Sequence, residues 1–225
     1  MNAAFSWWIW CIWSGGYNGD AQTVFFRSVT RKETRICKIV GGFAMNAGRI
    51  VIITGSPGTG KTTAAAFVAQ QSVLEKSIHM HTDDFYGYLS KGAIPPHLPE
   101  SHTQNNAVIA AFLQAAKCFA GSGYDVIVDG VIGPWFLDPW IRLAQSGVDV
   151  HYIVLRAGKE ETMRRAIERP KLNQGTNAEL VEAMWAQFTN LGRYERHVIE
   201  TDNLSIQETV LAILEAIANQ TVMLT

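Results

Sequence analysis

A glycine-rich segment at residues 55–62 restricts the possible folds of this chain more than any other feature of its sequence. It fits the pattern G-x-x-x-x-G-K-[ST] at every fixed position, and it lies between an apolar run at 50–54 and an alanine-rich stretch at 64–69. Such a segment joins a strand to a helix, and its backbone N–H groups, together with the helix N-terminus, surround a phosphate. The alternative is a glycine-rich turn that binds nothing.

The phosphate-binding interpretation gives each residue of the segment a role. Lys61, at the surface of the cradle, is expected to reach the β- and γ-phosphates of a nucleotide and to act in catalysis, and the Thr62 hydroxyl is expected to bind Mg²⁺. The residues expected to contact the nucleotide are Gly55, Ser56, Pro57, Gly58, Thr59, Gly60, Lys61, Thr62 and Thr63.

Short apolar runs alternate with helical patterns from residue 49 onward. Apolar residues recur at helical spacing over 108–119, and capping boxes at Thr176 with Glu179 and at Ser205 with Glu208 mark the starts of the last two helices. The apolar runs occupy five segments, at 50–54, 78–82, 125–129, 148–155 and 197–200. This pattern predicts an α/β fold in three layers, a sandwich with a five-stranded parallel sheet between helices.

Two of these strands lead directly into acidic residues. Asp83 and Asp84 follow the run at 78–82, which we expect to neighbour the strand before the cradle, and Asp129 ends the run at 125–129. Ligands bind at the carboxyl ends of parallel strands. One of the paired acids can therefore accept a proton from an attacking hydroxyl or position Mg²⁺, and Asp129 can hold Mg²⁺ directly or through a water. Alternatively, Asp83 and Asp84 form a solvated helix cap.

Arg165 and Arg169 lie four residues apart after the fourth apolar run, so they share one face of a helix. Two arginines in this position can close over a nucleotide and neutralise charge on the phosphoryl group that is transferred. The alternative is a solvated helix in which Glu161 and Glu168 pair with these arginines.

Composition and charge disfavour several other functions. A chain of 225 residues with a net charge of −1 is expected to form one domain without overall attraction for nucleic acid, and its three widely spaced cysteines offer no zinc or redox pair. Residues 1–44 carry a charge of +3, from five basic and two acidic residues, and their tryptophan-rich run at 5–13 is too short to span a membrane. We expect residues 45–225 to fold as a cytoplasmic domain without a membrane partner. Residues 1–44 are expected to be a poorly ordered or non-native extension, or alternatively an extra strand or hairpin.

Together, these motifs resemble the small P-loop kinases, which include shikimate and gluconate kinases, chloramphenicol phosphotransferase and the kinase domain of polynucleotide kinases. The resemblance extends from Arg49 to about Ala218 and implies a P-loop NTPase fold that uses ATP and Mg²⁺. In these families the first acid after the second strand is the catalytic base or a substrate ligand, which here is Asp83. An arginine-bearing lid follows their fourth strand, which here corresponds to Arg165 and Arg169.

The resemblance also bears on the substrates. Adenine is expected near residues 201–204, and Gly87 stands where polynucleotide kinases carry an arginine for the substrate phosphate, so a nucleic-acid acceptor is not expected. The predicted enzyme transfers the γ-phosphate of ATP to a hydroxyl of a small molecule held between residues 92–105 and 130–140. The alternatives are a nucleotide-dependent regulatory ATPase, or switch, without such an acceptor, and a toxin-type kinase of sugar nucleotides.

Overall fold

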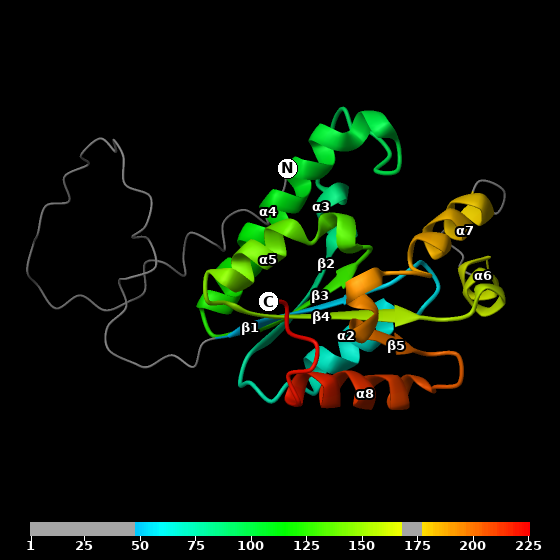
Figure 1. Cartoon of the computed structure of the whole chain (residues 1–225). Helices are drawn as coiled ribbons and strands as arrows, with labels where there is room; N and C mark the ends of the chain where they lie inside the picture. Colours follow the sequence, from blue (N-terminus) through cyan, green and yellow to red (C-terminus); the bar gives the residue numbers. More distant parts are fainter. Residues whose placement is uncertain (1–47, 168–176) are drawn as a thin grey trace, which may run out of the picture. The chain divides into compact units, whose positions relative to one another are not determined.

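The computed structural model describes residues 48–167 and 177–225, which belong to one compact unit, Gly41–Thr225. The predicted extension at 1–44, together with Arg169 and Thr176, lies outside these described residues. Five strands form one sheet in the order β2-β3-β1-β4-β5, and every neighbouring pair is parallel (Figure 1). The strands are β1 Arg49–Thr54, β2 Ser77–His81, β3 Asp125–Gly130, β4 Asp149–Arg156 and β5 Val198–Glu200. The predicted parallel sheet is confirmed.

The strand order agrees with how deeply each strand is buried. β1, β3 and β4 are buried along nearly their whole length, whereas β2 and β5 are partly exposed, as expected for strands at the edges of a parallel sheet. β3 lies between β2 and β1. The expectation that the strand before Asp83 would neighbour the strand before the cradle is therefore wrong, because apolar periodicity predicts that a strand exists but not which strand pairs with it.

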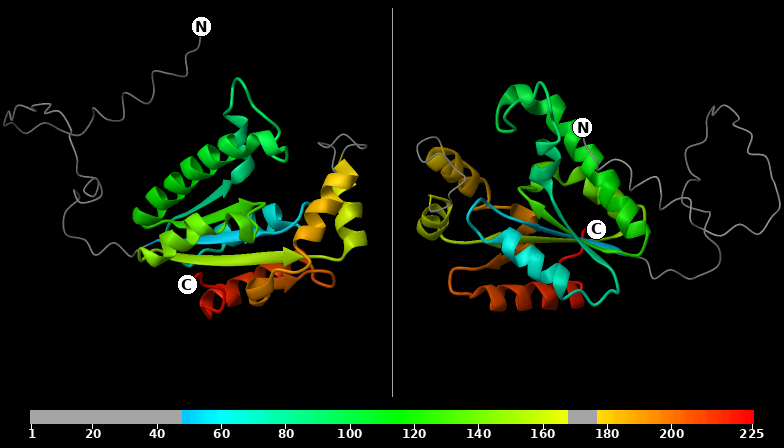
Figure 2. Two further views of the ribbon diagram at one scale, coloured as in Figure 1. Left: turned by 45° about the horizontal axis from the view of Figure 1, so that its top comes forward. Right: turned by 180° about the vertical axis from the view of Figure 1, so that it is seen from behind.

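Helices cover both faces of the sheet, as Figures 1 and 2 show. Alternate residues of β1 divide between two cores: Ile50 and Ile52 face α4 and α5, while Val51 and Ile53 face α2 and α8. This arrangement is the predicted three-layer sandwich. The four covering helices are α2 Lys61–Gln70, α4 His102–Gly121, α5 Asp138–Gln145 and α8 Ile206–Ala218.

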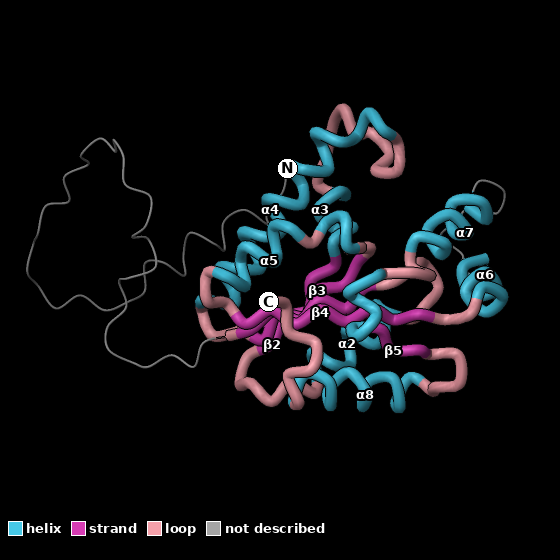
Figure 3. Tube along the Cα trace, in the orientation of Figure 1, coloured by secondary structure: helices cyan, strands magenta, loops and turns pink. Residues whose placement is uncertain are grey.

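The remaining helices include α3, which follows β2, and α6, which follows β4 and lies beside α7 (Figure 3). The predicted capping box at the start of α8 is confirmed, since Ser205 and Glu208 exchange side-chain and backbone hydrogen bonds. In the part of the chain that the structure describes, no helix is both long and apolar enough to cross a membrane. The bounds are α3 Thr82–Gly87, η1 Pro99–Ser101, η2 Pro134–Phe136, α6 Lys159–Ile167, α7 Asn177–Gln187 and η3 Gly192–His197.

The last residues of the chain cover an open stretch of β4. β5 is short and pairs only with the final three residues of β4. Upstream of that pairing, Tyr152 N donates to Val222 O and Leu224 N donates to Val150 O, both at 2.8 Å, and His151 forms an antiparallel bridge with Met223. The backbone of β4 is thus hydrogen-bonded to the tail where β5 does not reach.

Candidate active site

The phosphate-binding segment forms a tight loop between β1 and α2. Gly58 has a φ of 92°, and a Cβ added there would lie 2.5 Å from the carbonyl oxygen of Thr162 in α6. A larger residue would therefore both strain the backbone and clash with α6. Ser56 and Thr59 are buried, and Thr59 Oγ1 donates to Ser56 O at 3.0 Å. The loop is held by its own hydrogen bonds and by the neighbouring helix.

Lys61 begins α2, and only 7% of its surface is exposed. Its Nζ donates to the carbonyl oxygen of Ser56 at 3.4 Å, which folds the ammonium back over the loop. The expectation that Lys61 lies at the surface of the cradle is wrong, since the apolar stem of a lysine can be buried while its head keeps a hydrogen bond. Thr62 is half-buried next to it, and Thr63 is exposed in the first turn of α2.

Thr62 and Asp129 meet where β1 and β3 end side by side. Asp129 is fully buried, and its Oδ2 accepts a hydrogen bond from Thr62 Oγ1 at 2.6 Å. Burial opposes ionisation of Asp129, but contacts with His79, His81 and Thr62 outweigh it and hold the pKa of this carboxyl well below its usual range. A hydroxyl and an ionised carboxylate are oxygen donors of the kind that Mg²⁺ prefers, so these residues fit the expected metal.

Two histidines of β2 complete this cluster, and sequence reasoning assigned them no role. His79 Nε2 lies 2.7 Å from Asp129 Oδ1, and His81 Nδ1 lies 3.1 Å from the same oxygen. His81 Nε2 lies 3.2 Å from Asp83 Oδ2, so this ring spans two carboxylates. Its contacts with Asp129 and Asp83 raise the pKa of His81 to about 10. The available signal was the alternation His-x-His, which places both rings on one face of a strand.

Asp83 lies in the first turn of α3, and its side chain is 74% exposed. Contact with His81 lowers the pKa of Asp83, and the charge of Lys61 acts in the same direction. Because β1 and β2 belong to one parallel sheet, Asp83 and the cradle both follow strands at its carboxyl end. Asp84 is also exposed, and it makes no ion pair with any residue that the structure describes. Of the paired acids, only Asp83 is therefore connected to the buried cluster.

A glycine at the end of β3 sets α3 against this cluster. A Cβ added to Gly130 would lie 1.9 Å from the Oγ1 of Thr82, the first residue of α3. Only a residue without a side chain allows α3 to approach the end of β3 this closely. Asp129 and Asp83 are thereby kept on neighbouring elements at the carboxyl end of the sheet.

Arg165 lies on α6, the helix that touches the cradle through Thr162 and Gly58. Its Nε lies 2.5 Å from Glu161 Oε1, and Arg164 also pairs with Glu161 at 2.8 Å. These arginines lower the pKa of the half-buried Glu161 carboxyl to about 2. The structure thus shows the expected alternative partner for Arg165. Arg169 and Glu168 lie outside the described residues.

A small hollow of about 230 Å³ lies where β4 and β5 end, next to residues 201–204, where adenine is expected. Trp185 Nε1 donates to Ala157 O at 3.0 Å, and Gly158 N donates to Asp202 Oδ1 at 2.5 Å, so the wall of this hollow is internally hydrogen-bonded. Its lining residues are Arg156, Ala157, Gly158, Trp185, Thr189, Glu200 and Asp202.

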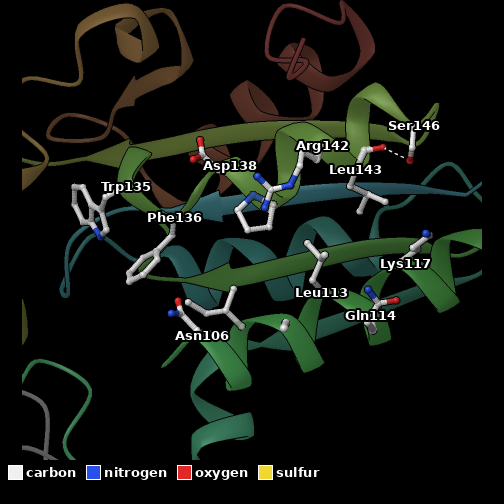
Figure 4. Close-up of a pocket in the computed structure, with 13 residues that line it drawn as sticks. Asn106, Leu113, Gln114, Lys117, Trp135, Phe136, Asp138, Arg142, Leu143 and Ser146 are labelled. Atoms are coloured by element: carbon white, nitrogen blue, oxygen red, sulfur yellow. Dashed lines mark hydrogen bonds between the residues drawn. The ribbon is translucent and has the colours of Figure 1, made fainter. Parts of the chain in front are cut away.

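A larger groove of about 530 Å³ runs between α4 and α5 (Figure 4). Trp135 and Phe136 lie at one end, and Lys117 and Ser146 lie at the other. No cradle residue lines it, and the segment 92–105 lines neither this groove nor the hollow beside β5. The two segments expected to enclose an acceptor therefore do not come together in either of these two pockets.

Comparison with known proteins agrees with this geometry. The cytidylate kinase of Pyrobaculum neutrophilum is 28% identical over 177 residues, which cover 75% of this chain and 92% of that protein. Solved structures with the same fold include the APS kinase of Mycobacterium tuberculosis, in complex with AMPPNP and APS, at 19% identity and a TM-score of 0.57 over 76% of this chain and 98% of that one. They also include a gluconokinase from Sinorhizobium meliloti at 17% identity and a TM-score of 0.52, over 78% and 94%.

The family assignment rests on a match to a family model. The model of the family described as "AAA domain" matches residues 51–186, more than half of the chain. This match runs from the strand before the cradle through α6 and most of α7, and the fold is that of the P-loop kinases, as the resemblance predicted. The protein belongs to the AAA domain family.

Proposed function

We propose that this protein transfers the γ-phosphate of ATP to a hydroxyl of a small molecule. The observation that carries the proposal is the position of Asp83, an exposed carboxylate joined through His81 to the buried Asp129 on the edge that bears the cradle. A general base must reach solvent-borne substrate, whereas a group that holds a metal is best buried and fixed. Asp83 and Asp129 fit these two roles respectively.

In the proposed reaction, the acceptor oxygen attacks the γ-phosphorus, the bond between that phosphorus and the β–γ bridging oxygen breaks, and ADP leaves. Asp83 takes the proton of the acceptor hydroxyl. Lys61 and the N–H groups of 55–63 neutralise charge on the β- and γ-phosphates. Thr62 and Asp129 would hold Mg²⁺, which supplies further charge neutralisation when bound.

The lid arginines have a proposed role in the same step. Arg165, once released from Glu161, would turn toward the transferring phosphoryl group, and Arg169, which lies outside the described residues, is the second arginine proposed for this role. The hollow beside Trp185 and Asp202 is a site for the nucleotide base, in the region where adenine is expected. These assignments place the nucleotide between β1 and the ends of β4 and β5.

The scarcity of basic residues in the part of the chain expected to bind the acceptor favours an acceptor hydroxyl over an acceptor phosphate. Between Thr82 and Ile141 the only lysines and arginines are Lys91 and Lys117, and Lys117 lines the groove between α4 and α5 rather than the cradle edge. An acceptor phosphate is normally bound by arginine side chains that match its geometry. The similarity to a cytidylate kinase makes a nucleoside monophosphate the second candidate acceptor.

The test is a screen for ADP formation from MgATP with gluconate, shikimate, chloramphenicol, uridine, a UDP-sugar and CMP, with product identified by mass. We expect a hydroxyl compound to be phosphorylated. Phosphorylation of CMP alone would establish the second candidate, phosphorylation of the UDP-sugar alone would favour a toxin-type kinase, and ATP turnover that no acceptor stimulates would favour a regulatory ATPase.

Replacing the proposed base tests its role directly. Asp83→Asn keeps shape and hydrogen bonding but cannot take a proton, so turnover should fall ~10²-fold or more while MgATP affinity changes little. Asp84→Asn is the matched control and should retain turnover, because Asp84 has no connection to the buried cluster. If Asp83→Asn and Asp129→Asn lose MgATP affinity equally and neither has a selective turnover defect, Asp83 is a metal ligand instead.

A further inference from the structure

The exposure of Asp83 poses a problem for a catalytic base. A carboxylate that is 74% exposed on a six-residue helix has several side-chain rotamers available, and only some of them face the cradle. A misplacement of about 1 Å can reduce a rate by ~10²-fold. An exposed base therefore needs a fixed partner.

His81 is the residue that supplies such a partner. Its Nε2 lies 3.2 Å from Asp83 Oδ2, and its Nδ1 lies 3.1 Å from the Oδ1 of Asp129. Asp129 is itself fully buried and is held on its other oxygen by Thr62 at 2.6 Å. The ring thus lies between an exposed carboxylate and a buried one on the adjacent strand.

We infer that His81 is a positioning residue, which orients the Asp83 carboxylate toward the cradle by joining it to Asp129. This inference rests on the proposed function, in which Asp83 is the base. In this role His81 affects turnover through its contact with Asp83. A loss of His81 should therefore lower turnover without a comparable change in MgATP affinity.

His79 provides a control from the same strand. It contacts the same Asp129 oxygen, at 2.7 Å, but forms no hydrogen bond or ion pair with Asp83. Side-chain exposure is similar for the two rings, at 25% for His79 and 27% for His81. A difference between the two substitutions consequently reports on the link to Asp83 rather than on imidazole loss in general.

The experiment is a double-mutant cycle in the full chain. We would measure the turnover number and KM for MgATP by two assays: phosphate release with water as the acceptor, and phosphorylation of the most active hydroxyl compound from the screen. His81→Phe should lower turnover ~10-fold or more in the wild-type background and less than about twofold in the Asp83→Asn background. The effect of His79→Phe should be the same in both backgrounds.

Two conservative variants separate positioning from a purely structural role. In His81→Gln the amide nitrogen lies near the position of Nε2 and can still donate to Asp83, whereas in His81→Asn it lies near Nδ1 and reaches only Asp129. Turnover should be partly restored by glutamine and not by asparagine, with similar thermal unfolding temperatures for both. These variants also keep the test valid if phenylalanine prevents folding.

The outcomes distinguish the inference from the function on which it depends. If Asp83→Asn has normal turnover, the proposed base is wrong. If Asp83→Asn is defective but His81→Phe retains wild-type turnover, or is equally damaging in both backgrounds, only the positioning role is overturned. Equal turnover in the glutamine and asparagine variants would overturn it as well.

Discussion

The two ends of β3 carry the same buried side chain in different surroundings. Asp125 begins the strand and Asp129 lies four residues further on, and neither is accessible to solvent. Asp125 accepts hydrogen bonds from Arg49 Nε at 2.9 Å, Arg49 Nη2 at 2.8 Å and Ser72 Oγ at 2.5 Å. Asp129 is held instead by two imidazoles and the Thr62 hydroxyl.

The difference shows that burial alone does not separate a structural acid from a functional one. Arg49 is a permanent cation whose planar fork occupies both oxygens of Asp125, so no ligand can take its place. The imidazoles and hydroxyl around Asp129 are weaker, exchangeable partners, and this acid lies at the carboxyl end of the sheet, where ligands of α/β folds bind. Asp125 and Asp129 therefore differ in their hydrogen-bonding partners and in the end of β3 at which they lie.

The largest expected effect is at the carboxyl end. Lys61→Ala should reduce phosphoryl transfer by ~10²–10³-fold, because it removes a charge that stabilises the transferring group, and should lower the melting temperature modestly, because the buried stem and the hydrogen bond to Ser56 O are lost as well. The measurements are kcat/KM for the phosphorylated acceptor and thermal unfolding. Retained activity would contradict the kinase assignment.

At the amino end, Asp125→Asn should lower the free energy of unfolding by about 3 kcal/mol, because it leaves Arg49 without its counter-charge. The Arg49 side chain is 17% exposed, which allows some compensation by water. Urea unfolding would measure this effect, and Ser72→Ala, with a loss of about 1 kcal/mol, is the milder comparison. A turnover defect per folded molecule would show that the amino end also has a catalytic role.

Asp129→Asn should weaken MgATP binding by ~10-fold or more, about 1.4 kcal/mol, when affinity is titrated at several Mg²⁺ concentrations. Its loss of unfolding free energy should be smaller than that of Asp125→Asn, because an imidazole nitrogen can either donate or accept a hydrogen bond and so can pair with the new amide, whereas the Arg49 guanidinium can only donate. If MgATP affinity does not depend on residue 129, this carboxylate does not hold the metal.

His151, near the amino end of the sheet, and His81, at its carboxyl end, should make the stability of the metal-free protein depend on pH in opposite directions. Burial, with the charge of Arg49, lowers the pKa of His151, so the unfolded chain binds a proton more readily and stability falls as pH drops below about 6.5. The pKa of His81 is raised to about 10, so its contribution is fully present below about 6.5 and is lost as pH rises through about 10.

Urea midpoints from pH 5 to pH 10 in EDTA would test this, with effects on the order of 1 kcal/mol on each side. His151→Gln should reduce only the loss of stability at acidic pH, and His81→Gln should reduce only the loss of stability at alkaline pH. A variant that changes the pH dependence on both sides would show that the two ends are coupled.

The smallest effect is expected from deletion of residues 1–44, since both acidic clusters lie within residues 49–129. We propose that the remaining 181 residues (225 − 44) form the kinase domain, and expect turnover to change by less than about twofold. Loss of folding or of activity on deletion would show that the tryptophan-rich segment is integral.

The fold was largely predictable because its signals are local. β-branched apolar runs and the glycine-rich segment define strand, loop and helix without knowledge of distant residues. Strand order was not predictable, since it depends on pairing between strands far apart in sequence. The meeting of Thr62 with Asp129 was anticipated because both follow from motifs at strand ends.

The rest of the candidate site depends on side-chain choices that a sequence does not reveal. His79 and His81 stand in an edge strand, where polar residues are common, and only the three-dimensional contact with Asp129 distinguishes them. Arg165 has two possible partners, a nucleotide phosphate and Glu161, and the structure pairs it with Glu161. The catalytic assignments of Asp83, Arg165 and Arg169 stay predictions.

The tail that hydrogen-bonds to β4 has a practical consequence for handling this protein. Residues 222–224 occupy backbone groups of β4 that would otherwise present an unpaired edge next to the short β5. Exposed strand edges recruit other chains and promote aggregation. A tag or partner protein fused directly to Thr225 would disturb the hydrogen bonds between residues 222–224 and β4, so an affinity tag should be attached through a spacer. Loss of the last four residues would favour self-association before it affected catalysis.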